Sequence, residues 1–229
     1  MVNVTINNKK ISVSEDSTIL EAAKIAGIKI PTLCYLKELN EIGACRICVV
    51  EVEGIEKLAP ACVTTVKEGM VIRTNSPRVR AARKTNIELI LSEHDCHCTS
   101  CARSGNCALQ AYANDIIANE KVYEKNIEEN EWDETFPLIK NTAKCIKCMR
   151  CIQFCDKVQT LGVWDILNSG ARTTVGVSGG RTIREANCSL CGQCITHCPV
   201  GALYGRSDTD RAFDAIADED KITICLLYT

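Results

Sequence analysis

The sequence is richest in one residue type that does chemistry, because cysteine accounts for 17 of its 229 residues. All of these cysteines except Cys225 fall into three blocks, at residues 34–62, 96–107 and 145–198. The N-terminus has no apolar core or cleavage site typical of a secretory signal, so an intracellular protein is expected. Disulfides are rare there, because thiols are kept reduced. The cysteine count is also odd, so internal pairing cannot use every thiol. Metal ligation is therefore the leading expectation.

The third block contains the most specific pattern, a C-x2-C-x2-C-x3-C spacing that occurs twice. The first copy comprises Cys145, Cys148, Cys151 and Cys155, and the second comprises Cys188, Cys191, Cys194 and Cys198, followed by Pro199. In the bacterial ferredoxin run, the fourth cysteine of each copy ligates the other 4Fe–4S cluster. The sequence therefore predicts crossed ligand sets, with Cys198 completing the first and Cys155 the second. Zinc is a weak alternative, since four cysteines within eleven residues would crowd one tetrahedral ion.

The first block supplies the four thiolates that a 2Fe–2S cluster needs: Cys34, Cys45, Cys48 and Cys62. Plant-type ferredoxins separate their first two cysteines by four residues, whereas ten residues lie between Cys34 and Cys45. The longer spacing resembles the N-terminal module of [FeFe]-hydrogenases and of the large iron–sulfur subunit of respiratory complex I. Zinc is again the alternative for four thiolates. The expected order of hairpin, helix and cysteine loop favours the cluster.

The second block offers one imidazole and three thiols in an H-x3-C-x2-C-x5-C spacing: His94, Cys98, Cys101 and Cys107. It resembles the 4Fe–4S site with one histidine ligand that follows the 2Fe–2S module in the same two families. We interpret His97 as an exposed loop histidine and Cys96 as a buried or free thiol, while a ligand exchange with Cys96 stays open. A neutral imidazole in place of a thiolate makes a cluster less negative, which should raise its reduction potential.

The residues around the first block predict the elements that position it. Alternating apolar residues on both sides of Asn7 and Asn8 predict a β-hairpin. The capping-box pair Thr18 and Glu21 predicts a helix that Gly27 ends. Returning strands are expected at 49–52 and 70–72. Two strands, a helix and a cysteine-bearing loop are the opening of a ferredoxin-like β-grasp module.

The later elements are fewer. Ser76 followed by a proline predicts the start of a helix that leads into the second block. The glycines between the two ferredoxin runs are interpreted as turns of an inserted hairpin: Gly162, Gly170, Gly176, Gly179 and Gly180.

The expected fold class is α+β, in three modules. Residues 1–77 should form the β-grasp 2Fe–2S domain, 78–118 a small helical histidine-ligated 4Fe–4S domain, and 139–209 a bacterial-type double 4Fe–4S ferredoxin domain. Residues 119–138 are expected to be an acidic, solvated linker, and 210–229 a C-terminal tail.

Composition and charge exclude several classes of function. The formal net charge of -2 gives no reason to expect nucleic acid or an anionic membrane as a partner. No stretch approaches the roughly 18 consecutive apolar residues of a spanning helix, so a cytoplasmic location is expected. Once the ligands are assigned, no Ser–His–Asp or paired-carboxylate arrangement remains. We therefore expect no catalytic residue and no substrate site in this sequence.

The order of the three motifs covers about residues 1–209 and is similar to the accessory iron–sulfur region of [FeFe]-hydrogenases and to the start of the complex I large subunit. This resemblance implies a redox subunit of a soluble multisubunit oxidoreductase, with one 2Fe–2S and three 4Fe–4S clusters. It suggests as partners a flavin- and NAD(H)-binding subunit, a small thioredoxin-like 2Fe–2S subunit, and a catalytic subunit that is a formate dehydrogenase or a hydrogenase. Soluble ferredoxin and a flavin-based bifurcating complex are further candidates.

Two other functions stay open at this point. The cysteine motifs of a hydrogen-activating domain do not occur in the sequence, so the alternative is a truncated [FeFe]-hydrogenase that lacks its catalytic domain. A more distant alternative is a zinc-based interaction module. Cys225 lies in a short apolar run and is interpreted as a small buried or partner-facing residue rather than a ligand.

Overall fold

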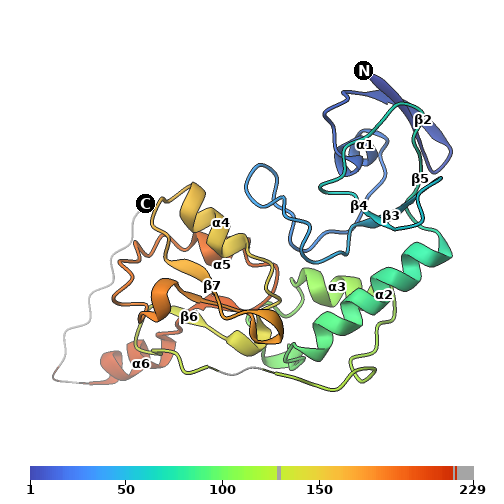
Figure 1. Ribbon diagram of the computed structural model, residues 1–229. Coiled ribbons are helices and arrows are strands. Elements are labelled where there is room, and N and C mark those ends of the chain that lie inside the picture. Colours follow the sequence, from blue (N-terminus) through green and yellow to red (C-terminus); the bar gives the residue numbers. More distant parts are fainter. Residues whose placement is uncertain (128–129, 219, 221–229) are drawn as a thin grey trace.

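Three parts follow one another along the chain and lie side by side (Figure 1). The computed structural model describes residues 1–127, 130–218 and 220. A five-stranded sheet with one helix comes first, a pair of helices follows, and two small two-stranded sheets with further helices complete the described chain. The expected α+β class is confirmed.

The first part has the expected β-grasp order. The hairpin pairs β1 (Val2–Ile6) with β2 (Lys9–Val13), and the two turn asparagines adopt positive φ angles that suit a tight hairpin. Strands β3 (Val49–Val52), β4 (Ala59–Pro60) and β5 (Val71–Arg73) complete the sheet in the order β2-β1-β5-β3-β4. Strand β5 runs parallel to β1, so the chain returns through the middle of the sheet.

The helix of the β-grasp part, α1 (Ile19–Ile25), begins and ends as the sequence predicts. Thr18 accepts a hydrogen bond from the Glu21 backbone, and the Glu21 carboxylate accepts one from the Thr18 backbone at 3.0 Å. Gly27 lies just past the end with a φ of 72°. Ile19, Ala22 and Ala23 are buried against the sheet, so this module has a core of its own.

The second part positions the His94 block between two helices. Helix α2 (Pro77–Ser92) begins at the predicted Ser76 cap, and its buried Val79, Ile87 and Leu91 lie on one face. A 3-10 turn (Cys98–Ser100) follows, and helix α3 (Ala108–Asp115), which the sequence patterns did not indicate, packs beside α2 (Figure 1).

The third part contains two short helices, α4 (Arg150–Lys157) and α5 (Gln193–His197), that pack against each other. Strand β6 (Leu138–Lys140) pairs with β9 (Leu203–Gly205), and β7 (Trp164–Leu167) pairs with β8 (Thr174–Val177). Three 3-10 turns lie at Thr142–Lys144, Gly170–Arg172 and Ser178–Gly180, and α6 (Thr209–Ala217) follows β9.

The inserted hairpin between the two ferredoxin runs is present as β7 and β8, but one of its glycines is not in a turn. Gly176 lies inside β8, where a Cβ atom would overlap the Leu167 side chain on the neighbouring strand. The turn interpretation of Gly176 is therefore wrong. The residue is small because a neighbouring side chain packs over it.

The segment expected to be a solvated linker is mostly exposed, but it is anchored after the undescribed pair 128–129. Phe136 and Leu138 are buried, and the Trp132 ring stacks on Trp164 with 5.9 Å between ring centroids. Trp132 Nε1 donates a hydrogen bond to the Leu138 carbonyl at 2.9 Å. The acidic composition of this segment gave no indication of these few apolar contacts. In the described part of the chain, no helix is long and apolar enough to cross a membrane.

Replacing Trp132 tests whether this segment is anchored. Trp132→Ala should lower the free energy of unfolding by about 2 kcal/mol, because it removes ring stacking, apolar burial and one hydrogen bond. Trp132→Phe keeps a stacked ring and should cost about half as much. Denaturant unfolding of the two variants measures the difference, and equal stability of Trp132→Ala and the native protein would contradict the anchoring role.

Candidate iron–sulfur centres

The first-block cysteines lie together as two close pairs. Cys48 Sγ is 3.3 Å from Cys62 Sγ, and the Cys34 backbone N–H lies 3.5 Å from Cys45 Sγ. The hydrogen bond with Cys34 lowers the pKa of Cys45 to about 5, and the pKa of Cys34 is raised in return. Cys62 lowers the pKa of Cys48 in the same way. Two pairs of sulfurs, each with one thiolate already favoured, suit a centre of two irons.

The second block places His94 as the sequence predicts, buried at the end of α2. Its side chain is 6% exposed, and its Nδ1 atom has no hydrogen-bond partner among the described residues. Burial is the main reason that the pKa of His94 is lowered to about 4, and the nearby Lys144 charge contributes to the same shift. A neutral imidazole with one free nitrogen is the form that binds metals. The expected exposed loop histidine, His97, has a side chain that is 87% exposed.

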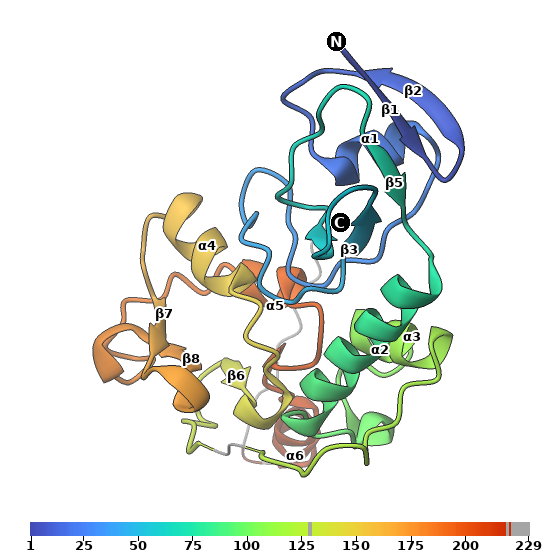
Figure 2. The same ribbon diagram turned by 45° about the vertical axis from the view of Figure 1, so that its right-hand side comes forward.

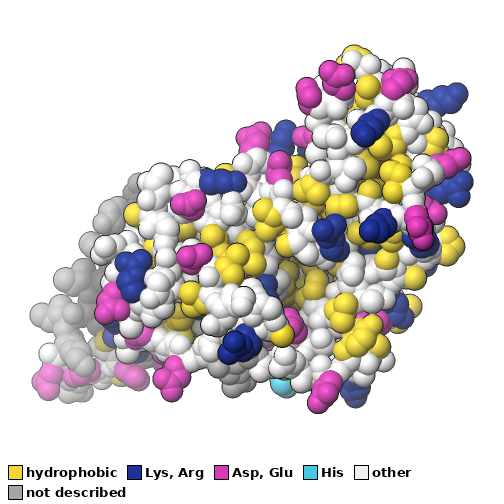
Figure 3. Space-filling model, in the orientation of Figure 1, with side chains coloured by type: hydrophobic (Ala, Val, Ile, Leu, Met, Phe, Trp, Pro, Cys, Tyr) yellow, Lys and Arg dark blue, Asp and Glu magenta, His cyan; other side chains and the backbone are white. Residues whose placement is uncertain are grey.

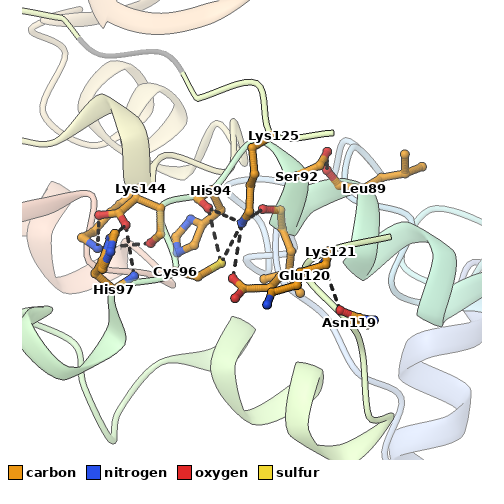
Figure 4. A network of polar contacts seen from close by, with 12 residues as sticks. Leu89, Ser92, His94, Cys96, His97, Asn119, Glu120, Lys121, Lys125 and Lys144 are labelled. Carbon is orange, nitrogen blue, oxygen red and sulfur yellow. Dashed lines mark hydrogen bonds and ion pairs between the residues drawn. The ribbon is translucent and has the colours of Figure 1, made fainter. Parts of the chain in front are cut away.

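Figure 4 shows the polar contacts that hold the His94 loop. Lys125 Nζ donates to the carbonyl oxygens of Leu91 and His94 at 2.8 and 3.2 Å, and it also contacts Cys96 Sγ at 3.3 Å. Glu120 lies 3.4 Å from the same ammonium group. Cys96 therefore participates in the network around the loop, and its burial raises its pKa to about 11. A residue expected to belong to the linker, Lys125, fixes the backbone of His94.

The three predicted ligand cysteines of the second block lie near one another and near the third part of the chain. Charges on Cys107 and Cys101 both act on Cys98, whose pKa is raised chiefly by burial. Cys101 Sγ packs so closely on Gly201 that a Cβ atom on that glycine would overlap the sulfur. This contact explains why a glycine occupies position 201, since its φ is not in the left-handed region.

The eight cysteines of the two ferredoxin runs line two separate cavities. One cavity is lined by Cys145, Cys148, Cys151 and Cys198, and the other by Cys155, Cys188, Cys191 and Cys194. These are the two crossed sets that the sequence predicts, so the fold brings together the residues of each set. Burial raises the pKa of both Cys148 and Cys194 to about 12. These two thiols are therefore protonated without a metal, and binding a cluster must release their protons.

The sixteen described cysteines are all free thiols, and Cys225 lies outside the described residues. Among the described residues, no three His, Cys, Asp or Glu side chains converge closely enough to hold a single metal ion. The donor chemistry fits iron–sulfur clusters at each site. The fit rests on free thiols in groups of three or four, all of them buried or partly buried except Cys191, and on the unpartnered nitrogen of His94.

Comparison with known proteins gives the same succession of domains. Residues 1–77 match the family model of a 2Fe-2S iron-sulfur cluster binding domain, and 83–121 match the NADH-ubiquinone oxidoreductase-G iron-sulfur binding region. Residues 144–202 match a 4Fe-4S dicluster domain. The chain therefore contains 2Fe–2S and 4Fe–4S binding domains in this order.

Curated relatives include two kinds of longer protein. The NADP-reducing hydrogenase subunit HndD of Solidesulfovibrio fructosivorans is 42% identical over 98% of this chain, which covers 39% of that protein. The mitochondrial NADH-ubiquinone oxidoreductase 78 kDa subunit of Candida albicans is 35% identical over 92% of the chain and is covered to 29%. The chain is similar to the N-terminal iron–sulfur region of these large subunits.

A solved structure shows the same fold over most of both chains. A chain in the crystal structure of an NAD+-reducing [NiFe]-hydrogenase in the H2-reduced state superimposes with a TM-score of 0.81 at 25% identity. The match covers 90% of this chain and 88% of that one. This iron–sulfur region is therefore an electron-transfer region like those of NAD(P)-linked hydrogenase and complex I subunits.

The long interval between Cys34 and Cys45 forms a loop that docks this region's first module on its third. Figure 2 shows the loop, in blue, extending from the β-grasp sheet to α4 and α5, as it does in Figure 1. Asn40 is fully buried in it, and its Nδ2 donates to the carbonyl oxygens of Cys34 at 2.7 Å and Cys148 at 2.8 Å. One amide thus joins a cysteine of the first block to a cysteine of the third.

Arg150 adds hydrogen bonds to the contact between the first and third modules. Its guanidinium donates to the carbonyl oxygens of Cys34 at 3.1 Å, Tyr35 at 2.7 Å and His197 at 3.3 Å. Lys157 Nζ also donates to the Leu39 carbonyl at 2.7 Å. Because these bonds reach backbone atoms, they fix the path of the cysteine loops relative to one another.

A third set of contacts joins the His94 loop to the first ferredoxin run. Lys144 Nζ lies 2.7 Å from Asp95 Oδ2, and the Asp95 backbone N–H donates to the Ala143 carbonyl at 2.8 Å. Burial would raise the pKa of Asp95, but hydrogen bonds from Lys144 and His97 hold it well below its usual range. Each ion-pair partner is directly next to a predicted ligand, His94 or Cys145, so the pair positions both sites.

Sequence reasoning missed these positioning residues. Asn40 could have been noticed, because the interval between Cys34 and Cys45 is longer than a 2Fe–2S loop needs. Arg150, Lys144 and Gly201 gave only one signal, their position close to a cysteine. Lys125 lies in the acidic stretch and gave none.

Gly201 offers a test of how the second and third parts meet. Gly201→Ala should displace Cys101 and impair the His94 centre, so iron should fall from about fourteen to about ten atoms per chain. Gly205→Ala is the matched control, because nothing lies within 4 Å of a Cβ atom there. Iron and acid-labile sulfide analysis measures the effect. Full iron content in Gly201→Ala would contradict this role of the contact.

Asn40→Asp tests the contact between the first and third modules. The substituted carboxylate has no donor for the two carbonyl oxygens and leaves a buried charge unpaired, so stability should fall by about 3 kcal/mol. Hydrogen exchange should also become faster in residues 35–45. The control is Asn75→Asp at an exposed position. Unchanged exchange in the loop would show that Asn40 does not hold the modules together.

Proposed function

We propose that this chain is the electron relay of a multisubunit NAD(P)- or ferredoxin-linked oxidoreductase, and that it holds one 2Fe–2S and three 4Fe–4S clusters. The observation that carries the proposal is the pair of cavities lined by crossed cysteine sets, joined to the first-block cysteines through Asn40. When bound, the clusters supply storage and transfer of single electrons. The chain's own residues hold these groups, exclude water and fix their spacing.

The proposed ligands follow the groups that the fold brings together. The 2Fe–2S centre takes the four first-block cysteines, and the second centre takes His94 with Cys98, Cys101 and Cys107. The remaining two centres take the crossed sets. Cys96 is left out because its thiol contacts Lys125 and the His94 carbonyl. We propose the same three domains with bounds 1–77, 78–118 and 139–209.

The partners are proposed from the relatives, which are subunits of NAD(P)-linked hydrogenases and complex I. A flavin- and NAD(H)-binding subunit and a small thioredoxin-like 2Fe–2S subunit would exchange electrons with this chain. A hydrogenase or formate dehydrogenase would supply the catalytic site, and soluble ferredoxin is a further electron partner. We place the assembly in the cytoplasm, where thiols stay free for cluster binding.

A second candidate is the accessory region of an [FeFe]-hydrogenase chain. The observation that favours it is the 42% identity to HndD over 98% of this chain. Anoxic purification of the native protein separates the two candidates. Co-elution with separate flavoprotein and catalytic subunits supports the first, whereas hydrogen uptake by a longer form of the same polypeptide supports the second. Both require about fourteen iron atoms in this region, and a zinc-containing, iron-free protein would contradict both.

The histidine ligand has a specific consequence. His94→Cys replaces a neutral donor by a thiolate, so the reduction potential of that 4Fe–4S centre should fall. EPR-monitored redox titration measures the midpoint potential, and His97→Gln is the control at the exposed neighbouring imidazole. A midpoint that does not move in His94→Cys would contradict the assignment of His94.

A further inference from the structure

Arg83 is a buried cation without an anionic partner among the described side chains. It lies on α2 and is 8% exposed. Its Nη2 donates to the Val49 carbonyl at 2.9 Å, and its Nε has no hydrogen-bond partner. Buried charges in proteins are normally paired, because desolvation of a lone ion is costly. The site is therefore incomplete unless an anion lies near the guanidinium.

The charged surroundings of Arg83 identify that anion. Burial lowers the pKa of Arg83, and the side chain whose charge opposes this shift is Cys48. Cys48 directly precedes Val49, the residue that accepts the Arg83 hydrogen bond. The neighbouring charges on α2 are also positive, since Arg80 and Lys84 lie one turn or less away. Lys84 has its own partner in Glu88, at 4.0 Å.

The charges on the surface near Arg83 also favour Cys48 as the source of the opposing charge. Figure 3 shows Lys and Arg side chains gathered where the β-grasp part meets α2 and α3. The charged residues that line a groove there are Lys29, Arg80, Arg83, Lys84 and one acid, Asp115, whose charge does not contribute to the shift in the pKa of Arg83. The guanidinium thus lies between a positively charged surface and the cysteine loop. Cys48 is the residue of that loop whose charge acts on Arg83.

We propose that Arg83 is the counter-charge of the 2Fe–2S centre and raises its reduction potential. This inference rests on the proposed assignment of Cys34, Cys45, Cys48 and Cys62 to that centre. A 2Fe–2S cluster with four thiolates is negative, and reduction adds one more negative charge. A fixed buried cation stabilises the reduced form more than the oxidised form, because the local dielectric constant is low. Arg83 acts through the Cys48–Val49 segment and is a positioning and tuning residue.

Helix α2 provides a control within the same contact. Asn86 lies three residues after Arg83, and its Nδ2 donates to the Arg46 carbonyl at 2.8 Å. The helix therefore contacts the Cys45–Val49 loop twice, once with a charged donor and once with a neutral one. A purely structural role would be shared by Arg83 and Asn86. An electrostatic role belongs to Arg83 alone.

The test is an EPR-monitored redox titration of the complete chain, purified without oxygen and checked for iron content. Arg83→Gln should lower the ratio of reduced to oxidised 2Fe–2S centre at a given potential at least tenfold, which corresponds to a midpoint lower by about 59 mV for one electron. Arg83→Lys, which keeps the charge, should recover most of this shift. Asn86→Ala and the exposed Arg80→Gln should leave the midpoint unchanged, as should the 4Fe–4S centres of every variant. Arg83→Met is prepared in parallel as an apolar replacement in case Arg83→Gln does not fold.

Three results would overturn the proposal. The first is an unchanged 2Fe–2S midpoint in a fully loaded Arg83→Gln or Arg83→Met protein. The second is an equal shift in Asn86→Ala, which would assign the effect to loop geometry. The third is a native midpoint that changes with added phosphate at constant ionic strength, which would pair Arg83 with an anion in the groove. A native protein without any 2Fe–2S signal would instead contradict the proposed function itself.

Discussion

The side-chain amide of Asn40 donates hydrogen bonds to the backbone carbonyls of two cysteines from different modules. The distance between the cluster sites depends on contacts of this kind. Its two hydrogen bonds reach Cys34 in the first module and Cys148 in the third, with Arg150 bonding to the same Cys34 carbonyl. The Asn40 Oδ1 atom remains without a partner among the described residues, so the amide is placed for its donors. Bonds to backbone atoms tolerate little movement, and electron transfer between modules needs a fixed separation.

The modules share more than this contact. One hydrophobic cluster includes Leu33 and Ile47 from the β-grasp part, Ile87 from α2 and Leu203 from β9. Cys151, Cys155 and Cys198 are part of the same interior, and burial raises the pKa of several cysteines of the ferredoxin runs. Small modules with few aromatic side chains have modest cores, so metal binding and folding are coupled in them. Loss of one cluster should therefore destabilise the neighbouring cluster sites.

Three cations lie beside the ligand loops, and two of them, Lys144 and Arg83, are buried. Lys144 precedes Cys145 and pairs with Asp95, Lys125 bonds to the His94 carbonyl, and Arg83 reaches the residue after Cys48. Each cation is either next to a proposed ligand in the sequence or bonds to the backbone of a ligand or of the residue next to it. Thiolate-bound clusters are negative, so nearby cations reduce the repulsion that accumulates when electrons are added. The same side chains that hold the loops in place thus also influence their electrostatics.

Local features could be predicted from the order of residues: the hairpin, the capped helices α1 and α2, and the groups of cysteines with their crossed pattern. These depend on residue spacing over a few positions, which periodicity, caps and ligand motifs report directly. Long-range contacts became visible only in the folded chain, such as Asn40 with Cys148, Cys101 on Gly201, and Lys125 with the His94 loop. The fold also buries Phe136 and Leu138 in a stretch that composition had marked as solvated. The physical reason is that such contacts join residues far apart in the chain, and no short pattern specifies which surfaces pack together.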